Sequence, residues 1–91
     1  YHLRAGSSMI DLVDMLGKLG PDGGAAPGDE GHNMDHFALR LNNFDAAVIQ
    51  AWFHQNDIDI GEEVQRFGAA GDGPSLYLSD PEGNRLELKG Q

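Results

Sequence analysis

The stretch SLYLSDPEGNRLELKG, residues 75–90, predicts two β-strands joined by a tight turn. Its DPEGN segment favours a reversal of the chain because Gly83 can adopt positive φ without steric cost. In the second strand Leu86 and Leu88 alternate with Glu87, so the two kinds of side chain point to opposite faces of a sheet. The leucines are expected to pack against a helix, which leaves Glu87 on the other face.

The residues before this hairpin predict the rest of an α+β module. MDHFALRL (34–41) alternates cleanly, and EEVQRFGAAG (62–71) is typical of a strand that enters a glycine-rich turn. Between them, NNFDAAVIQAWFHQNDI (42–58) has apolar residues at helical spacing, with Asn43 as the expected N-cap. The stripe expected to face the core consists of Phe44, Val48, Ala51 and Trp52. The order of elements over residues 34–91 is therefore βαβββ.

The first 16 residues predict a separate β-hairpin, formed by YHLRAG and SMIDLVD. Its end, Ile10-Asp11-Leu12, repeats the pattern Leu86-Glu87-Leu88 of the last hairpin. Residues 17–33 contain six glycines and two prolines and are expected to form a connecting loop rather than a lid. The chain thus resembles the end of one βαβββ module (1–16) and a complete second module (34–91). Further residues are expected to precede Tyr1 in the natural polypeptide.

Composition restricts the partners. Fifteen acidic residues against six Lys and Arg give a formal net charge of −9, which disfavours binding to nucleic acid and to anionic membrane surfaces. The chain has no cysteine, so disulfides and thiolate metal sites are excluded and a cytoplasmic location is expected. No apolar run approaches the ~20 residues that span a bilayer, and no signal peptide is visible.

The alternation places two metal-binding side chains on one face. With Phe37, Leu39 and Leu41 under the helix, His36 falls on the same face as Glu87 if the first and last strands of the module are neighbours. An imidazole and a carboxylate on a rigid sheet are a typical arrangement for a divalent metal. Asp11 takes the position equivalent to Glu87 in the repeat and is a third candidate ligand. A solvated acid is the plainer interpretation of Asp11.

These segments resemble the vicinal oxygen chelate superfamily, which includes glyoxalase I, the extradiol dioxygenases, methylmalonyl-CoA epimerase, and the fosfomycin and bleomycin resistance proteins. The resemblance is carried by DHFALRL, by the helix with its tryptophan and by RFGAAGDGPSLYLSDPEGNRLEL, and it extends loosely to residues 1–16. The pattern SLYxxDPxGNxxEL is typical of the superfamily and does not choose among its members.

The resemblance implies paired βαβββ modules that form an open cup around one divalent ion, such as Zn, Ni, Mn or Fe. His36 and Glu87 match the first-strand and last-strand ligands of the second module, and Asp11 falls where glyoxalase I places a glutamate. The first-strand ligand of the first module has no counterpart, so it comes from other residues, from a second chain through swapped pairing, or not at all. Arg40 is expected to bind an anionic group of the substrate or to form a salt bridge, and Tyr77 is expected to line the pocket.

The function expected from this resemblance is that of a metal-dependent isomerase or lyase of the glyoxalase type. In it the metal chelates two adjacent oxygens of a small substrate and Glu87 moves the proton. Three alternatives remain: an extradiol-type dioxygenase, a bleomycin-resistance-like protein that binds a cationic drug without catalysis, and an inert half-cup. Unpaired strand edges also predict a homodimer with twofold symmetry.

Overall fold

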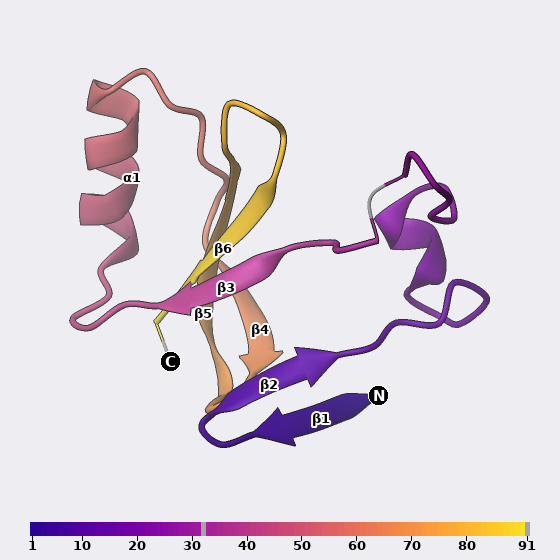
Figure 1. Ribbon diagram of the computed structural model, residues 1–91. Helices are drawn as coiled ribbons and strands as arrows, with labels where there is room; N and C mark the ends of the chain where they lie inside the picture. The colour runs from indigo at the N-terminus through magenta and orange to yellow at the C-terminus, as the bar shows by residue number, and fades with distance from the viewer. Residues whose placement is uncertain (32, 91) are drawn as a thin grey trace. The chain divides into compact units, whose positions relative to one another are not determined.

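The computed structural model describes residues 1–31 and 33–90, and the chain forms two compact units, Tyr1–Asp35 and His36–Gln91 (Figure 1). The first unit contains an antiparallel hairpin of β1 (His2–Ala5) and β2 (Ser8–Asp11). Gly6 reverses the chain between them at φ 64°, a conformation that glycine adopts readily. The connecting segment expected to be an irregular loop includes a short 3₁₀ helix, η1 (Gly20–Gly23).

The second unit is a four-stranded sheet with one helix, and its element order is βαβββ. The helix α1 (Ala46–Gln55) follows β3 (Phe37–Arg40) and precedes β4 (Val64–Gly68), β5 (Gly71–Ser79) and β6 (Arg85–Lys89). The strand order is β3-β6-β5-β4, with β3 parallel to β6 and the other neighbours antiparallel. The expected neighbourhood of the first and last strands is therefore present, and the α+β class is confirmed.

The apolar core lies on the side of the sheet that the helix covers. Leu76 of β5 and Leu88 of β6 are register partners, and both are buried. Phe44, just before α1, lies so close to Gly90 that a β-carbon at Gly90 would come within 2.9 Å of its ring. Alternation within β5 and β6 thus sends the leucines toward the helix side and Glu87 toward the other face.

The inner face of α1 differs from the expected stripe. Val48 and Trp52 are 64% and 55% exposed, whereas Ile49 and Phe53 are half-buried. The helix carries two adjacent apolar stripes, one residue out of phase, and periodicity alone does not decide which one packs on the sheet. Among the described residues no helix is both long and apolar enough to cross a bilayer.

The prediction of Asn43 as the N-cap of α1 is wrong. Asp45 is the cap, and its Oδ1 accepts a hydrogen bond from the Val48 amide at 3.2 Å. Asn43 instead has φ 54°, a left-handed conformation that asparagine tolerates better than most residues. The helix therefore begins two residues later than an Asn43 cap would have it.

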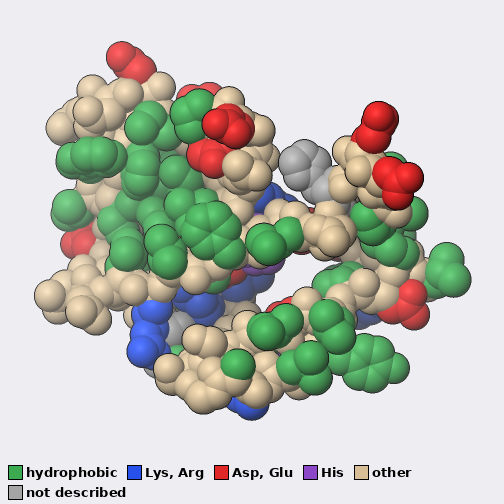
Figure 2. Space-filling view, viewed as in Figure 1, with side chains coloured by type: hydrophobic (Ala, Val, Ile, Leu, Met, Phe, Trp, Pro, Cys, Tyr) green, Lys and Arg blue, Asp and Glu red, His purple; other side chains and the backbone are tan. Residues whose placement is uncertain are grey.

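Two residues expected under the helix are only partly covered. Phe37 and Leu39 of β3 are 49% and 48% exposed. β3 is an outer strand of its sheet, and the helix packs closest to β5, two strands away. Figure 2 accordingly shows hydrophobic side chains exposed over α1 and β3.

Candidate functional site

The face of the sheet opposite the helix carries a connected set of polar side chains. The register places Glu87 of β6 directly between Ala38 of β3 and Tyr77 of β5, so these three residues share one face. Two positions further along, Lys89 lies between Arg40 and Ser75 in the same way. We call this surface the polar face.

His36 reaches Glu87 from the residue just before β3. Its Nε2 lies 3.1 Å from Glu87 Oε1, and the two side chains are 31% and 7% exposed. A carboxylate can only accept a hydrogen bond, so the imidazole donates from Nε2 when that atom carries the proton. The sequence-based prediction that these two residues meet on one face agrees with this contact.

Ser75 and Lys89, which were not predicted as site residues, support the second oxygen of the Glu87 carboxylate. Ser75 Oγ donates to Glu87 Oε2 at 2.5 Å, and Ser75 is fully buried. Lys89 Nζ donates to Ser75 Oγ at 3.4 Å, and also to the carbonyls of Gly73 (3.3 Å) and Arg66. The three protons of the ammonium thus match three acceptors in the protein. A chain of hydrogen bonds runs from Lys89 through Ser75 to Glu87, and His36 meets the other oxygen.

Glycine makes room for the buried lysine. The Lys89 side chain crosses from β6 to β4, where its Cε would lie 2.5 Å from a β-carbon placed on Gly68. Gly68 is buried, and Gly73, whose carbonyl accepts from the lysine, is buried as well. The glycines at the end of β4 and the start of β5 therefore accommodate Lys89.

Tyr77 borders the same network with its ring. It makes an edge contact with the His36 ring at a centroid distance of 5.5 Å, and the Arg85 guanidinium carbon lies 4.8 Å from its ring centroid. Burial raises the pKa of the Tyr77 phenol above its ordinary value, the negative charge of Glu87 adds to the rise, and Arg66 opposes it. The phenol therefore remains a neutral hydrogen-bonding group at ordinary pH.

The other two candidate residues, Arg40 and Asp11, lie in different units. Arg40 is exposed on the polar face, beside Lys89. Asp11 belongs to the hairpin of the other unit, where its Oδ1 lies 2.5 Å from His2 Nδ1. His54 is exposed in the last turn of α1, and His32 lies outside the described residues.

The sequence contains only a weak indication that Ser75 and Lys89 belong to the site. Ser75 precedes Tyr77 by two positions and Lys89 follows Glu87 by two, so alternation alone puts them on the polar face. Alternation does not predict that the two side chains are buried, because Ser and Lys at such positions are usually solvated. Only the hydrogen-bonded chain in the structure distinguishes them from surface residues.

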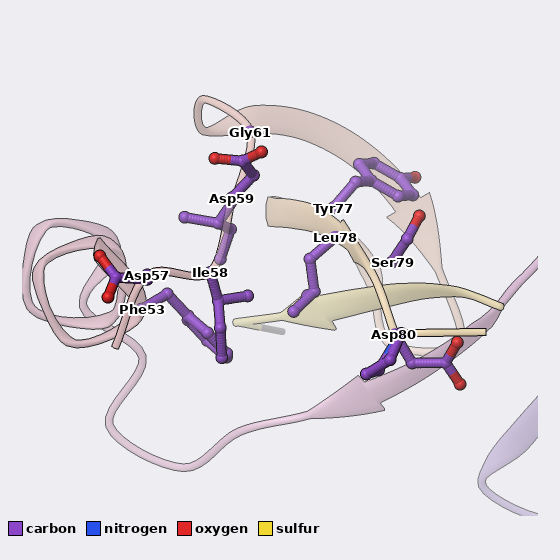
Figure 3. Close-up of a pocket in the computed structure, with 11 residues that line it drawn as sticks. Phe53, Asp57, Ile58, Asp59, Gly61, Tyr77, Leu78, Ser79 and Asp80 are labelled. Carbon is purple, nitrogen blue, oxygen red and sulfur yellow. The ribbon is translucent and has the colours of Figure 1, made fainter. Parts of the chain in front are cut away.

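A hollow of the second unit lies away from the polar face. It has a volume of about 790 Å³ and opens between the end of α1 and the end of β5 (Figure 3). Leu78 points toward Ile58 there, while Tyr77 and Ser79 point the other way. Three acidic residues line it, namely Asp57, Asp59 and Asp80. None of the described residues that line the hollow is histidine, lysine or arginine, so the polar face offers the richer chemistry.

The geometry of His36 and Glu87 fits two ligands of a divalent ion. Their separation of 3.1 Å matches the roughly 3.0–3.4 Å between neighbouring ligands with bonds near 2.1 Å. Ser75 fixes the carboxylate from the far side, as supporting residues commonly do at metal sites. Among residues 1–31 and 33–90, however, no three His, Cys, Asp or Glu side chains converge to hold a metal. The pair is thus part of a site whose other positions need water, substrate or another protein group.

Comparisons of the chain with protein-family models, curated proteins and solved structures give no match. What the chain does is therefore inferred from the polar face itself.

Proposed function

We propose that the protein is a metal-dependent enzyme of the vicinal oxygen chelate type, most similar in chemistry to a glyoxalase-like isomerase or lyase. The observation that carries the proposal is the contact between His36 Nε2 and Glu87 Oε1 on the face of the sheet opposite the helix. The βαβββ order with neighbouring first and last strands supports it, because this topology brings the two side chains together from positions 51 residues apart.

His36 and Glu87 would hold the ion, which would act as a Lewis acid on two adjacent oxygens of the substrate. Glu87 would also move the proton, accepting it from the carbon beside those oxygens and returning it to the neighbouring carbon. Ser75 keeps the opposite oxygen engaged, so the carboxylate is held in one orientation. Tyr77 lies beside both residues and would line the substrate pocket as a neutral donor.

A complete site needs more than these two ligands, since catalytic zinc sites commonly use three protein ligands. We propose that it is completed in a homodimer with twofold symmetry. The outer strands of the four-stranded sheet, β3 and β4, offer hydrogen-bonding edges of the kind that a second copy can pair with. Light scattering at micromolar concentration should give twice the 9.8 kDa mass of the chain.

The decisive experiment is titration of the protein with Mn²⁺ and Zn²⁺, followed by calorimetry. We expect binding in the wild type, loss of binding in His36→Ala and unchanged binding in His54→Ala, which removes an exposed histidine from the helix. Circular dichroism should show that both variants are folded. Equal metal binding by wild type and His36→Ala, or none by either, would overturn the proposal. Turnover of hemithioacetals with the bound metal would then test the reaction class.

A further inference from the structure

The few basic residues of this acidic chain are concentrated in its sheet. Strands β3, β4, β5 and β6 hold four of the six Lys and Arg residues but only two of the fifteen Asp and Glu residues, Asp72 and Glu87. The four bases are Arg40, Arg66, Arg85 and Lys89. The net charge of the protein is therefore a poor guide to the charge near this sheet.

All four bases point to the polar face. Arg40 and Ser75 are the register partners of Lys89, while Arg85 pairs with Ser79, four positions further along β5 on the same face. Arg66 lies opposite Gly73, two positions before Ser75, and so shares that face as well. Asp72, in contrast, alternates onto the helix side. Glu87 is thus the single acid that the four strands contribute to this face.

The bases have two different roles. Lys89 is buried and directs its ammonium at protein acceptors, so it contributes charge rather than a contact for a ligand. Arg40, Arg66 and Arg85 are exposed. Arg85 stacks on Tyr77, and Arg66 is close enough to the Tyr77 phenol to influence its pKa. Two guanidinium groups therefore flank the ring that contacts His36.

We propose that the polar face binds a small molecule that carries a carboxylate or phosphate in addition to its adjacent oxygens. The planar guanidinium of arginine matches these oxyanions with paired hydrogen bonds, and it keeps its charge at any working pH. The inference rests on the proposed function and narrows its substrate to an anionic class. It also opposes the expectation that an acidic protein of this type would take a cationic drug, since the four bases of the sheet share the polar face.

The test compares three probes in metal-free buffer at 0.15 M salt by calorimetry or NMR. Hydroxyacetone carries adjacent oxygens without a charge, malate carries adjacent oxygens and carboxylates, and dihydroxyacetone phosphate carries adjacent oxygens and a phosphate. Charge-assisted hydrogen bonds of about 1.5–3 kcal/mol predict that malate, dihydroxyacetone phosphate or both bind roughly tenfold to a hundredfold more tightly than hydroxyacetone. Whichever of the two binds better identifies the anionic group.

The double variant Arg66→Gln/Arg85→Gln should lose this preference. Its control, Arg4→Gln/Lys18→Gln, removes the same charge from exposed positions of the other unit and should keep it. Equal affinity for all three probes, or equal losses in both double variants, would overturn the proposal. So would tighter binding of spermidine than of either anion.

Mn²⁺ titration of the same proteins separates the two proposals. Metal binding through His36 without a preference for the anions would overturn the anionic class and leave the metal site standing. An arginine-dependent preference without metal binding would support an oxyanion site on this face and reject the metal-dependent function.

Discussion

Among the described residues, two histidine–carboxylate pairs, His2–Asp11 and His36–Glu87, differ sharply in their surroundings. In the hairpin, His2 and Asp11 face each other across β1 and β2, with 62% and 46% of their side chains exposed. In the sheet, His36 and Glu87 are 31% and 7% exposed. The Asp11 position corresponds to that of Glu87 in the sequence repeat, yet only Glu87 has buried residues behind it.

The difference shows how much a functional carboxylate depends on its neighbours. An exposed pair is screened by water and contributes little, commonly about 0–1 kcal/mol. Glu87 is held by a buried serine, which in turn is held by a buried lysine. A two-stranded hairpin has no third strand from which such support could come, whereas β5 supplies it in the sheet.

The largest effect on stability should come from the apolar core of the second unit, which supports the His36–Glu87 pair and not the His2–Asp11 pair. Leu76→Ala removes a fully buried side chain from β5 and should lower the free energy of unfolding by about 2–5 kcal/mol. The control, Leu3→Ala in β1, removes a side chain that is about half exposed and should cost less than about 1 kcal/mol. Urea denaturation and hydrogen exchange of the β5 and β6 amides would measure both. Similar losses in the two variants would contradict the difference in packing.

A smaller effect on stability should come from removing the hydrogen bond that Ser75 donates to Glu87. Ser75→Ala leaves one carboxylate oxygen and one lysine proton without their buried partner, which should cost about 1–3 kcal/mol. Metal affinity should fall by about tenfold to a hundredfold, as for other residues that orient a ligand, and Ser75→Thr should restore part of it. Ser8→Ala, an exposed position in β2, should change stability by no more than about 0.5 kcal/mol and leave metal binding intact. Metal affinity unchanged in Ser75→Ala would separate Ser75 from the site.

The smallest effect concerns the turns of the two hairpins. In the β5–β6 turn, Asp80 accepts hydrogen bonds from the amides of Glu82 and Asn84 and from the Asn84 side chain. These bonds, above all those from Asn84, lower the pKa of Asp80 below its ordinary value. Its folded pKa is thus below the unfolded one, so the stabilisation is complete above the unfolded pKa and is lost as pH falls through the folded pKa.

Asp80→Asn should therefore lower the melting temperature slightly at pH 7, and the difference from wild type should disappear in strong acid. Ser7→Ala, in the turn of the other hairpin, should show no such dependence on pH. A difference between wild type and Asp80→Asn that persists at the acidic end would mean that the charge of Asp80 is not what stabilises the turn.

Much of the sheet could be predicted from the sequence because its signals are local. The turn at Gly83 and the alternation of Leu86, Glu87 and Leu88 specify the last hairpin and the face that Glu87 occupies. The contact of His36 with Glu87 followed from one further assumption, the parallel pairing of β3 with β6. No local signal specifies that these strands are neighbours, so their pairing entered the prediction only as a condition.

The parts that could not be predicted depend on packing between elements. Trp52 is exposed and Phe53 is turned inward because the helix uses one of two adjacent apolar stripes, and the choice depends on the sheet beneath it. Burial of Lys89 depends on space above Gly68 and on carbonyls from another strand. No pattern within β6 distinguishes this lysine from a solvated one.

The burial of Lys89 also has a consequence for chemical labelling. The chain has two lysines, and Lys89 is 5% exposed with its nitrogen enclosed by acceptors, whereas Lys18 is exposed. Amine-reactive dyes should therefore modify Lys18 far faster than Lys89. The single tryptophan, Trp52, is in the other unit. An acceptor dye on Lys18 thus forms an energy-transfer pair with Trp52, which would report the distance between the two units without any engineered cysteine.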